Sequence, residues 1–73
     1  MPTPPRQRKL IGEAIRRSRT TAGLTQEELA EKAELHPVYL GQLERGEQTV
    51  SIYALMRLAR ALSVRVRDLV ADL

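Results

Sequence analysis

The charged side chains of this 73-residue chain are unevenly distributed, and they indicate the kind of ligand they could bind. The first 24 residues hold six basic side chains against one acidic one, a net charge of +5, whereas the rest of the chain has a net charge of −2. The basic side chains of this first third are Arg6, Arg8, Lys9, Arg16, Arg17 and Arg19. A charge polarised in this way suits a polyanion at one end, although a solvated basic helix face has the same composition.

Side chains for covalent or metal chemistry are almost absent. The chain has no cysteine and a single histidine, His36, which excludes disulfides, thiolate metal sites and cysteine nucleophiles. The glutamates that follow Thr25 fit a helix start and a solvated helix face better than an acid–base pair. We therefore expect no enzyme activity, no metal and no cofactor.

The elements that position the polar side chains are expected to be helices. Three prolines among the first eight residues disfavour a helix, so residues 1–8 are expected to form a flexible N-terminal arm and residues 9–73 one all-α domain. Beyond the arm, apolar residues recur at helical spacing, and no alternating stretch is long enough to predict a sheet. Five helices are expected, over about residues 9–22, 25–33, 37–45, 52–62 and 66–72.

Local signals mark the ends of these helices. Thr25 and Glu28 have the spacing of a capping box, in which each side chain bonds the backbone N–H of the other. Pro37 suits the first position of a helix, and Ser51 is a good cap. Glycines suited to a left-handed stop follow two of the helices, at Gly23 and Gly46. Three pairs have the spacing of a hydrophobic staple: Leu24 with Leu29, Leu35 with Leu40, and Val50 with Leu55.

The core is expected to be aliphatic, since the chain has no Phe and no Trp. The apolar stripes consist of Leu10, Ile11, Ala14, Ile15 and Ala22 in the first helix, Leu29, Ala30, Ala33, Leu40 and Leu43 in the second and third, and Leu55, Leu58, Ala59 and Leu62 in the fourth. The apolar runs are far shorter than the roughly 20 residues that span a bilayer, and the basic N-terminus lacks the apolar segment of a signal peptide. The sequence therefore predicts a cytoplasmic protein that contacts no membrane.

The segment of residues 24–46 carries the strongest functional signal. Its sequence, LTQEELAEKAELHPVYLGQLERG, predicts a helix of about nine residues, a turn of about three and a second helix of about eight. Two helices that cross steeply through a short turn can place the second helix in the DNA major groove while the first lies across the backbone. Helix pairs of this length also occur in plain bundles.

Three segments resemble one family: LTQEELAEKA, YLGQLERGE and SIYALMRLARALSV are similar to the lambda, 434 and Cro-like repressors, also called the XRE family. The resemblance covers residues 11–73. Within the family, TVSIYALMRLARAL after ERG is similar to the controller proteins of restriction-modification systems. The resemblance implies a five-helix, lambda-repressor-like domain with a helix-turn-helix. It also implies a bacterial transcriptional regulator, associated with the nucleoid when bound, that represses transcription and regulates its own gene.

The resemblance assigns roles to individual positions. Gln26 matches a phosphate-contacting glutamine at the start of the second helix, where the helix dipole also favours an anion. Gln42 is expected to contact adenine and Val38 a thymine methyl, with Pro37 on the same base-facing surface. Tyr39 is expected either to bond a phosphate or to pack. Further phosphate contacts are expected from basic side chains, namely Arg16, Arg17 and Arg45, with Arg6 and Arg8 of the arm as further candidates.

Other positions are implied to be structural. Arg19 and Glu44 match an ion pair that joins the first and third helices and orients the recognition helix. The family's dimer-forming element corresponds to Val64, Val66, Leu69, Val70 and Leu73, although the same residues could cap the protomer core. A two-fold dimer would bind a pseudo-palindromic operator with half-sites about one helical turn apart.

Several positions depart from the family pattern. Glu34 stands where a glycine is usual, so it must adopt a positive φ or change the turn. Pro37 and Gln48 stand where controller proteins tend to have arginine, and Glu47 stands where relatives are often basic. These departures leave one alternative function open, a protein-interaction module of the same fold, such as an antitoxin or an adaptor with an unknown protein partner.

Overall fold

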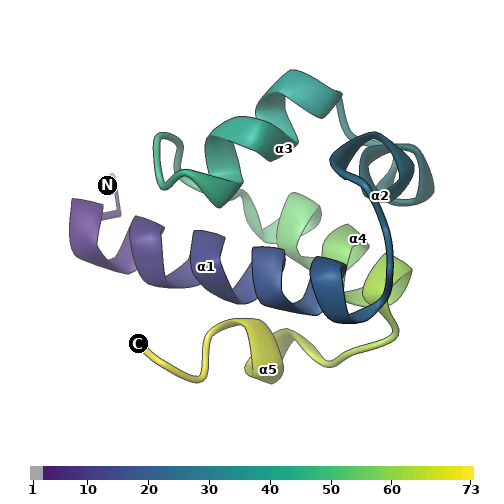
Figure 1. The fold of residues 1–73 in the computed structure, drawn as a ribbon. Coiled ribbons are helices and arrows are strands. Elements are labelled where there is room, and N and C mark those ends of the chain that lie inside the picture. The colour runs from purple at the N-terminus through teal and green to yellow at the C-terminus, as the bar shows by residue number, and fades with distance from the viewer. Residues whose placement is uncertain (1–2) are drawn as a thin grey trace.

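Five helices form the regular structure of residues 3–73, the part of the chain that the computed structural model describes. They are α1 (Pro5–Thr21), α2 (Gln26–Ala33), α3 (Pro37–Glu44), α4 (Ile52–Leu62) and α5 (Val66–Leu69), and these residues contain no strand. In Figure 1, α1 crosses the middle of the molecule, with α2 and α3 on one side of it and α5 on the other. The five-helix, all-α architecture predicted from the sequence is confirmed.

The helices share one aliphatic core, to which each contributes one large, fully buried side chain: Ile15, Leu29, Leu40, Leu58 and Leu69. Burial of such a side chain is worth about 1.5–3 kcal/mol relative to its exposure. Alanines of α2 and α4 allow close packing between the larger residues. The core includes most of the predicted residues, but Ala22 is exposed because α1 ends at Thr21 and the chain turns away from the core there.

The helix starts follow the predicted local signals. The capping box of α2 is present, with Glu28 N donating to Thr25 Oγ1 at 3.1 Å and Thr25 N donating to Glu28 Oε1 at 2.8 Å. The bond from the Thr25 backbone N–H, followed by that with its hydroxyl, lowers the pKa of the Glu28 carboxyl. At α4, Ser51 Oγ accepts a hydrogen bond from Ala54 N at 3.0 Å.

Four helices end in the same hydrogen-bonded turn, the Schellman motif. At the end of α3, for example, Gly46 N donates to Leu43 O and Glu47 N donates to Gln42 O. The residue in the left-handed conformation is a glycine after α1 and α3, but it is Glu34 after α2 and Ser63 after α4. Glu34 therefore keeps the usual turn and adopts the positive φ of 57°.

The first helix begins earlier than predicted, at Pro5 instead of residue 9. Pro5 occupies the first helical turn, where its missing N–H removes no helical hydrogen bond, and Pro4 precedes it with extended geometry. The prediction of an arm over residues 1–8 is therefore wrong for Pro5–Arg8. Residues 1 and 2 of that arm lie outside the described residues.

The last helix is shorter than predicted and ends at Leu69 instead of residue 72. Val70 leaves helical geometry, with φ −117° and ψ 10°. Asp72 then reaches back to α1, where its Oδ2 lies 3.0 Å from Arg17 Nη2. After Leu69 the chain therefore leaves the helix, and Asp72 contacts α1.

Candidate nucleic-acid interface

The α2–α3 pair forms a helix-turn-helix whose turn is set by Glu34, Leu35 and His36. Glu34 is left-handed, and Leu35 N donates to Ala30 O at 2.8 Å, which closes α2. His36 caps α3, because its Nδ1 accepts a hydrogen bond from Val38 N at 3.1 Å. The turn directs the start of α3 outward.

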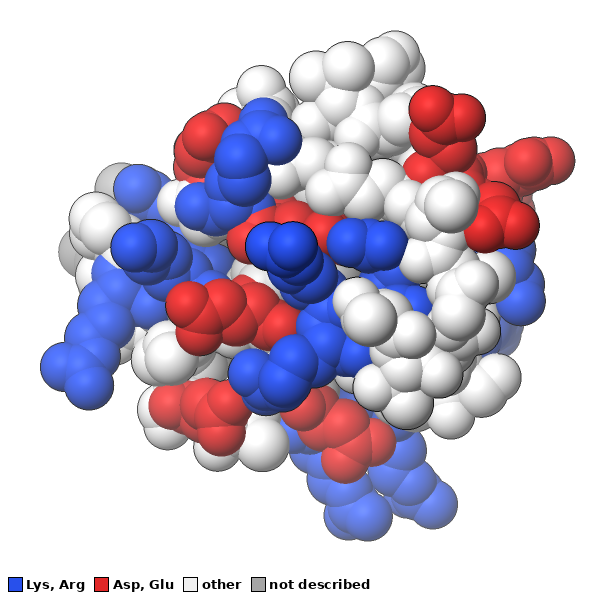
Figure 2. Space-filling view, in the orientation of Figure 1, with Lys and Arg blue, Asp and Glu red and all other residues white. Residues whose placement is uncertain are grey.

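The outer surface of α3 is uncharged. No residue between Leu35 and Leu43 carries a charge, and Figure 2 shows the surface over the start of α3 without Lys, Arg, Asp or Glu. Pro37 and Val38 are exposed, Val38 by 60%, and Gln42 is half-buried. A shallow groove runs between α3 and the start of α2, lined by Gln26, Glu27, Pro37, Val38, Gly41 and Arg45. This surface offers apolar groups and amides to a ligand.

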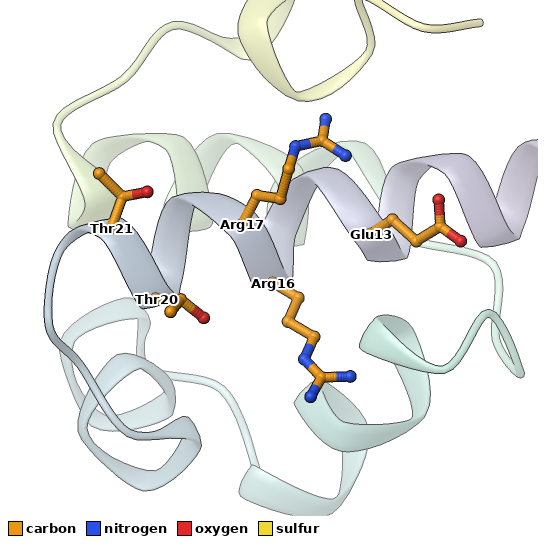
Figure 3. A pocket seen from close by; sticks show the side chains of 5 residues that line it. All are labelled: Glu13, Arg16, Arg17, Thr20 and Thr21. Carbon is orange, nitrogen blue, oxygen red and sulfur yellow. The ribbon is translucent and has the colours of Figure 1, made fainter.

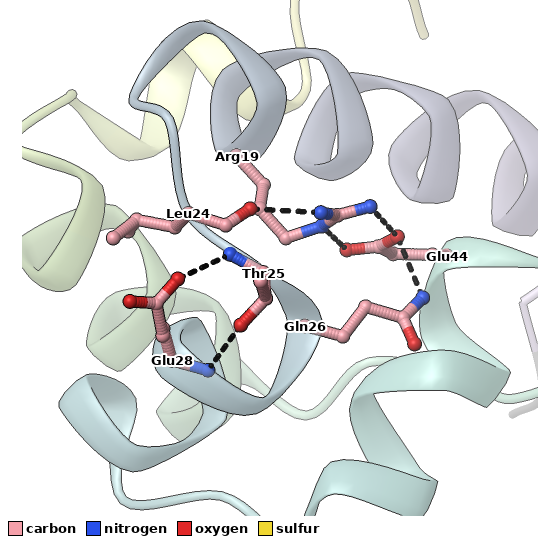
Figure 4. A network of polar contacts seen from close by, with 6 residues as sticks. All are labelled: Arg19, Leu24, Thr25, Gln26, Glu28 and Glu44. Carbon is pink, nitrogen blue, oxygen red and sulfur yellow. Dashed lines mark hydrogen bonds and ion pairs between the residues drawn. The ribbon is translucent and has the colours of Figure 1, made fainter.

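A polar network fixes α3 against the two preceding helices (Figure 4). Arg19 Nε donates to Glu44 Oε2 at 2.7 Å, and Arg19 Nη2 donates to Glu44 Oε1 at 3.1 Å. Arg19 Nη1 also donates to Leu24 O at 2.9 Å, while Gln26 Nε2 donates to Glu44 Oε1 at 2.9 Å. The Glu44 side chain is 2% exposed. The ion pair implied by the resemblance is thus part of a larger network that connects α1, α2 and α3.

This network engages Gln26, the residue implied to contact a phosphate. Its amide nitrogen is bonded to Glu44, and its Oε1 is directed toward Gly41 of α3, 3.6 Å from where a Cβ at that glycine would lie. Gln26 is also the first residue of α2, at the end of the helix that favours an anion. Its side chain is therefore held at the edge of the α2–α3 groove.

Tyr39 has a structural role. Its hydroxyl donates to Thr49 O at 3.2 Å and lies 3.3 Å from Ser51 N, which donates to it. The ring packs against the core. Of the two interpretations of Tyr39 from the sequence, packing describes its observed contacts, and the hydroxyl is occupied by the loop that joins α3 to α4.

The predicted phosphate-binding arginines lie on different sides of α1. Arg16 and Arg17 point in opposite directions, Arg17 toward α5 and Arg16 toward the side of α3 (Figure 3). Arg16 shares the face of α1 that contains Gly12 and Arg19, because residues three and four apart lie above one another on a helix. Arg17 is paired with Asp72. The structure therefore places Arg16 on the α3 side of α1 and Arg17 on the opposite side, beside Asp72.

Arg45, the last predicted phosphate contact, is held by a neighbouring carboxylate. Arg45 Nε donates to Glu47 Oε2 at 3.0 Å and Arg45 Nη2 to Glu47 Oε1 at 3.1 Å. The hydrogen bond from Arg45 lowers the pKa of the Glu47 carboxyl, and the same bond raises the pKa of Arg45. Both side chains are more than half exposed. Glu47 thus occupies the guanidinium fork that a phosphate would take.

The sequence did not reveal how closely the backbone of α1 approaches the end of α3 at Gly12. A Cβ at Gly12 would collide with the carbonyl oxygen of Leu43 and lie 2.8 Å from that of Glu44. The available signal was a glycine in the interior of a helix, which usually marks close packing. Gly12 lets the backbone of α1 touch the end of α3.

The residues implied to form a dimer interface do not share one environment. Leu69 is 1% exposed and belongs to the protomer core, so its assignment to an interface between protomers is wrong. The half-buried side chains that pack beside it are Val64, Val66 and Val70, whereas Leu73 is exposed. Large exposed apolar side chains that the sequence analysis did not single out lie on α4, at Ile52, Tyr53 and Met56.

No helix within residues 3–73 has the length and apolar character to cross a bilayer. No group of three or more acidic or histidine side chains in that part of the chain is arranged to hold a metal ion.

Comparison with known proteins gives consistent similarities. The family HTH_3, described as helix-turn-helix, matches residues 15–69. Control protein C.SmaI of Serratia marcescens is 39% identical over 62 residues, which cover 85% of this chain and 74% of that protein. The restriction-modification controller protein C.AhdI from Aeromonas hydrophila has a similar structure, with a TM-score of 0.83 and 39% identity over 85% of this chain and 94% of that one. The biofilm regulator SinR, solved in complex with DNA, gives a TM-score of 0.78 and 38% identity over 81% of this chain and 95% of that one.

Proposed function

Because this chain belongs to the HTH_3 family of helix-turn-helix transcriptional regulators, as its sequence indicated, we propose that it binds a pseudo-palindromic DNA operator as a homodimer and represses transcription. The observation that carries the proposal is the α2–α3 pair. Its second helix presents an uncharged surface at Pro37, Val38 and Gln42, of which Pro37 and Val38 are exposed and Gln42 is half-buried. The Arg19–Glu44 pair connects the far end of this helix to α1. A recognition helix needs such a rigid support.

Base contacts in this proposal come from α3. The Gln42 amide is suited to bond adenine in a bidentate manner, and the exposed Val38 is suited to pack on a thymine methyl. Pro37 lies on the same surface. Phosphate contacts come from Gln26 at the start of α2 and from Arg16 and Arg45, with Arg45 leaving Glu47 for the phosphate. We assign no DNA contact to Arg17, which points away from α3 toward α5, or to Tyr39, whose hydroxyl bonds the loop between α3 and α4.

The dimer contact is proposed at the half-buried and exposed residues around α5, namely Val64, Val66, Val70 and Leu73. Two exposed apolar residues allow a clean test, because neither belongs to the protomer core: Leu73 is 59% exposed and Met56 of α4 is 54% exposed. We expect Leu73→Lys to shift the monomer–dimer equilibrium toward monomer in sedimentation experiments, and Met56→Lys to leave it unchanged. A dimer disrupted by Met56→Lys instead would place the contact on α4.

DNA binding is tested by the salt dependence of affinity and by two substitutions. The DNA should be the duplex immediately upstream of the protein's own coding region, searched for an inverted repeat and footprinted. Affinity for it should fall steeply with salt, as counterion release requires. Gln42→Ala should reduce discrimination at one base step by about 1–3 kcal/mol, whereas Gln26→Ala should weaken binding to operator and random DNA alike. Equal losses on both DNAs for both variants would refute the assigned roles.

One alternative is favoured by a specific observation. The α3 surface lacks a basic side chain between Leu35 and Leu43, and the nearby Arg45 is neutralised by Glu47. A surface of this kind also suits a protein partner, as in an antitoxin or an adaptor. Absence of duplex binding at low salt would favour this alternative over the repressor.

A further inference from the structure

The start of the chain contacts the loop that follows α3. Arg8 Nε donates to Gly46 O at 3.1 Å, and Arg8 Nη1 donates to Thr3 O at 3.0 Å. Thr3 N lies 3.4 Å from Thr49 Oγ1 in the same loop. In Figure 1, this loop lies beside the first turns of α1. One guanidinium group thus joins the beginning of the chain to the end of α3.

Packing reinforces these hydrogen bonds. Gly46 is buried against Lys9, since a Cβ at Gly46 would lie 2.9 Å from Lys9 Cγ and 3.0 Å from Lys9 Cα. Gly46 also has a positive φ of 74°, so the loop can pass close to α1 only with glycine there. One helical turn further along α1, Gly12 touches the carbonyl groups of Leu43 and Glu44.

The same loop is held from the other side by Tyr39. The Tyr39 hydroxyl donates to the Thr49 carbonyl, while the Thr49 hydroxyl lies near the Thr3 backbone N–H. The loop is therefore located between α3 and the first residues of the chain.

The position of this loop determines the position of the last turn of α3. Glu47 N donates to Gln42 O at 2.9 Å and Gly46 N donates to Leu43 O at 3.1 Å, so the loop and the last turn of α3 form one hydrogen-bonded unit. Gln42 and Arg45, two of the proposed DNA contacts, belong to that unit. A displacement of Gly46 would move both side chains relative to the start of α3.

We propose that residues 3–9 form a clasp that positions the end of α3 from within the protomer, and that Arg8 is a positioning residue instead of a phosphate contact. The guanidinium of Arg8 is directed at two backbone carbonyls of the protein itself. An arm that reached the DNA would require Arg8 to leave both. The consequence for binding rests on the proposed function, whereas the clasp itself is a property of the free protein.

The free protein provides the first test, with Arg8→Ala, Arg8→Lys and the control Arg6→Ala, which removes the same charge from an exposed residue of the same segment. Lysine keeps the charge but not the planar fork that bonds two acceptors. We expect faster amide hydrogen exchange at Gly46 and Glu47 in both Arg8 variants, with exchange at the core residue Leu58 unchanged and no change in Arg6→Ala. Unchanged exchange at Gly46 and Glu47, or an equal increase at Leu58, would overturn the clasp.

DNA binding provides the second test, through the slope of log affinity against log salt. A positioning residue predicts that Arg8→Ala and Arg8→Lys both weaken binding to the upstream duplex by about tenfold, with the slope of the wild type retained. A phosphate contact predicts instead a slope lowered by about 0.9 in Arg8→Ala and an affinity largely retained in Arg8→Lys, which would overturn the proposal. Failure of the wild-type protein to bind DNA would refute the proposed function and leave the exchange test intact.

Discussion

Glu44 is the one buried charged side chain among residues 3–73, and it receives donors from two other helices. Because its carboxylate is removed from water, removal of its main partner leaves an uncompensated buried charge. Such a loss costs about 3 kcal/mol or more, whereas replacing both members of a buried pair by apolar residues is much less costly. A buried pair therefore differs from a surface pair in that removing one partner costs more stability than replacing both.

Arg19→Met is therefore expected to lower the free energy of unfolding in urea by about 3 kcal/mol, and the double variant with Glu44→Met by clearly less. Arg17→Met serves as the control, because its pair with Asp72 is more than half exposed and is worth about 1 kcal/mol at most. If Arg19→Met and Arg17→Met lower the free energy of unfolding equally, then the Glu44 carboxylate is solvated in the native protein.

At Glu47, a single charge opposes the proposed DNA contact of Arg45. Glu47→Gln is expected to release the Arg45 guanidinium, to increase affinity for duplex DNA and to make the salt dependence steeper by about one counterion. Fluorescence anisotropy over a salt series measures both quantities. Glu31→Gln, on the exposed face of α2, removes the same charge without touching Arg45 and should change the slope less.

At the scale of elements, two of the four Schellman turns use a residue that is strained in the left-handed conformation. Glu34→Gly is expected to raise the free energy of unfolding by about 1 kcal/mol, because glycine adopts positive φ without the clash of a Cβ. Thermal and urea unfolding measure the change. Glu34→Ala is the matched control, since it removes the carboxylate but keeps the Cβ. An equal gain from alanine would show that the charge of Glu34, and not its backbone, limits stability.

The capping box of α2 gives a pH dependence. Hydrogen bonds from Thr25 lower the pKa of Glu28 below its usual value of 4.5. A lowered pKa means that the ionised carboxylate favours the folded state, so this contribution is present above the unfolded pKa and is lost as pH falls through the folded one. Glu28→Gln should therefore flatten the decline of unfolding free energy between about pH 5 and pH 3. If the unfolding free energy of Glu28→Gln falls as steeply as that of the wild type, then other carboxylates cause the pH dependence.

For the molecule as a whole, the distance between α1 and α3 is set by the missing side chain of Gly12. Gly12→Ala is expected to cost about 1–3 kcal/mol, because the added methyl meets backbone carbonyls that cannot rotate away. It should also weaken DNA binding by displacing α3. Gly41→Ala is the control for stability, since its Cβ would meet only the flexible ends of Arg45 and Gln26 and alanine favours the helix. Chemical denaturation measures the unfolding free energy of both variants. An equal loss of stability in Gly41→Ala would contradict the role of the backbone contact at Gly12.

The sequence by itself determined the helices, the turn between α2 and α3, and the family. The helices and the turn follow from signals between residues a few positions apart, such as Thr25 with Glu28 or a proline at the first position of α3. The family follows from a resemblance that covers residues 11–73. The local signals gave the wrong start for the first helix, because a proline that disfavours a helix interior is accepted at a helix start, as at Pro5.

Only the tertiary structure decided which polar and apolar groups remain available for a ligand. Leu69 is in the core, Tyr39 bonds the α3–α4 loop, Arg17 pairs with Asp72, and Arg8 bonds Gly46. Arg17 and Asp72 are 55 positions apart, and Arg8 and Gly46 are 38 apart. Residue spacing predicts which face of a helix a side chain occupies, but the partner on that face depends on how the helices pack around their common core.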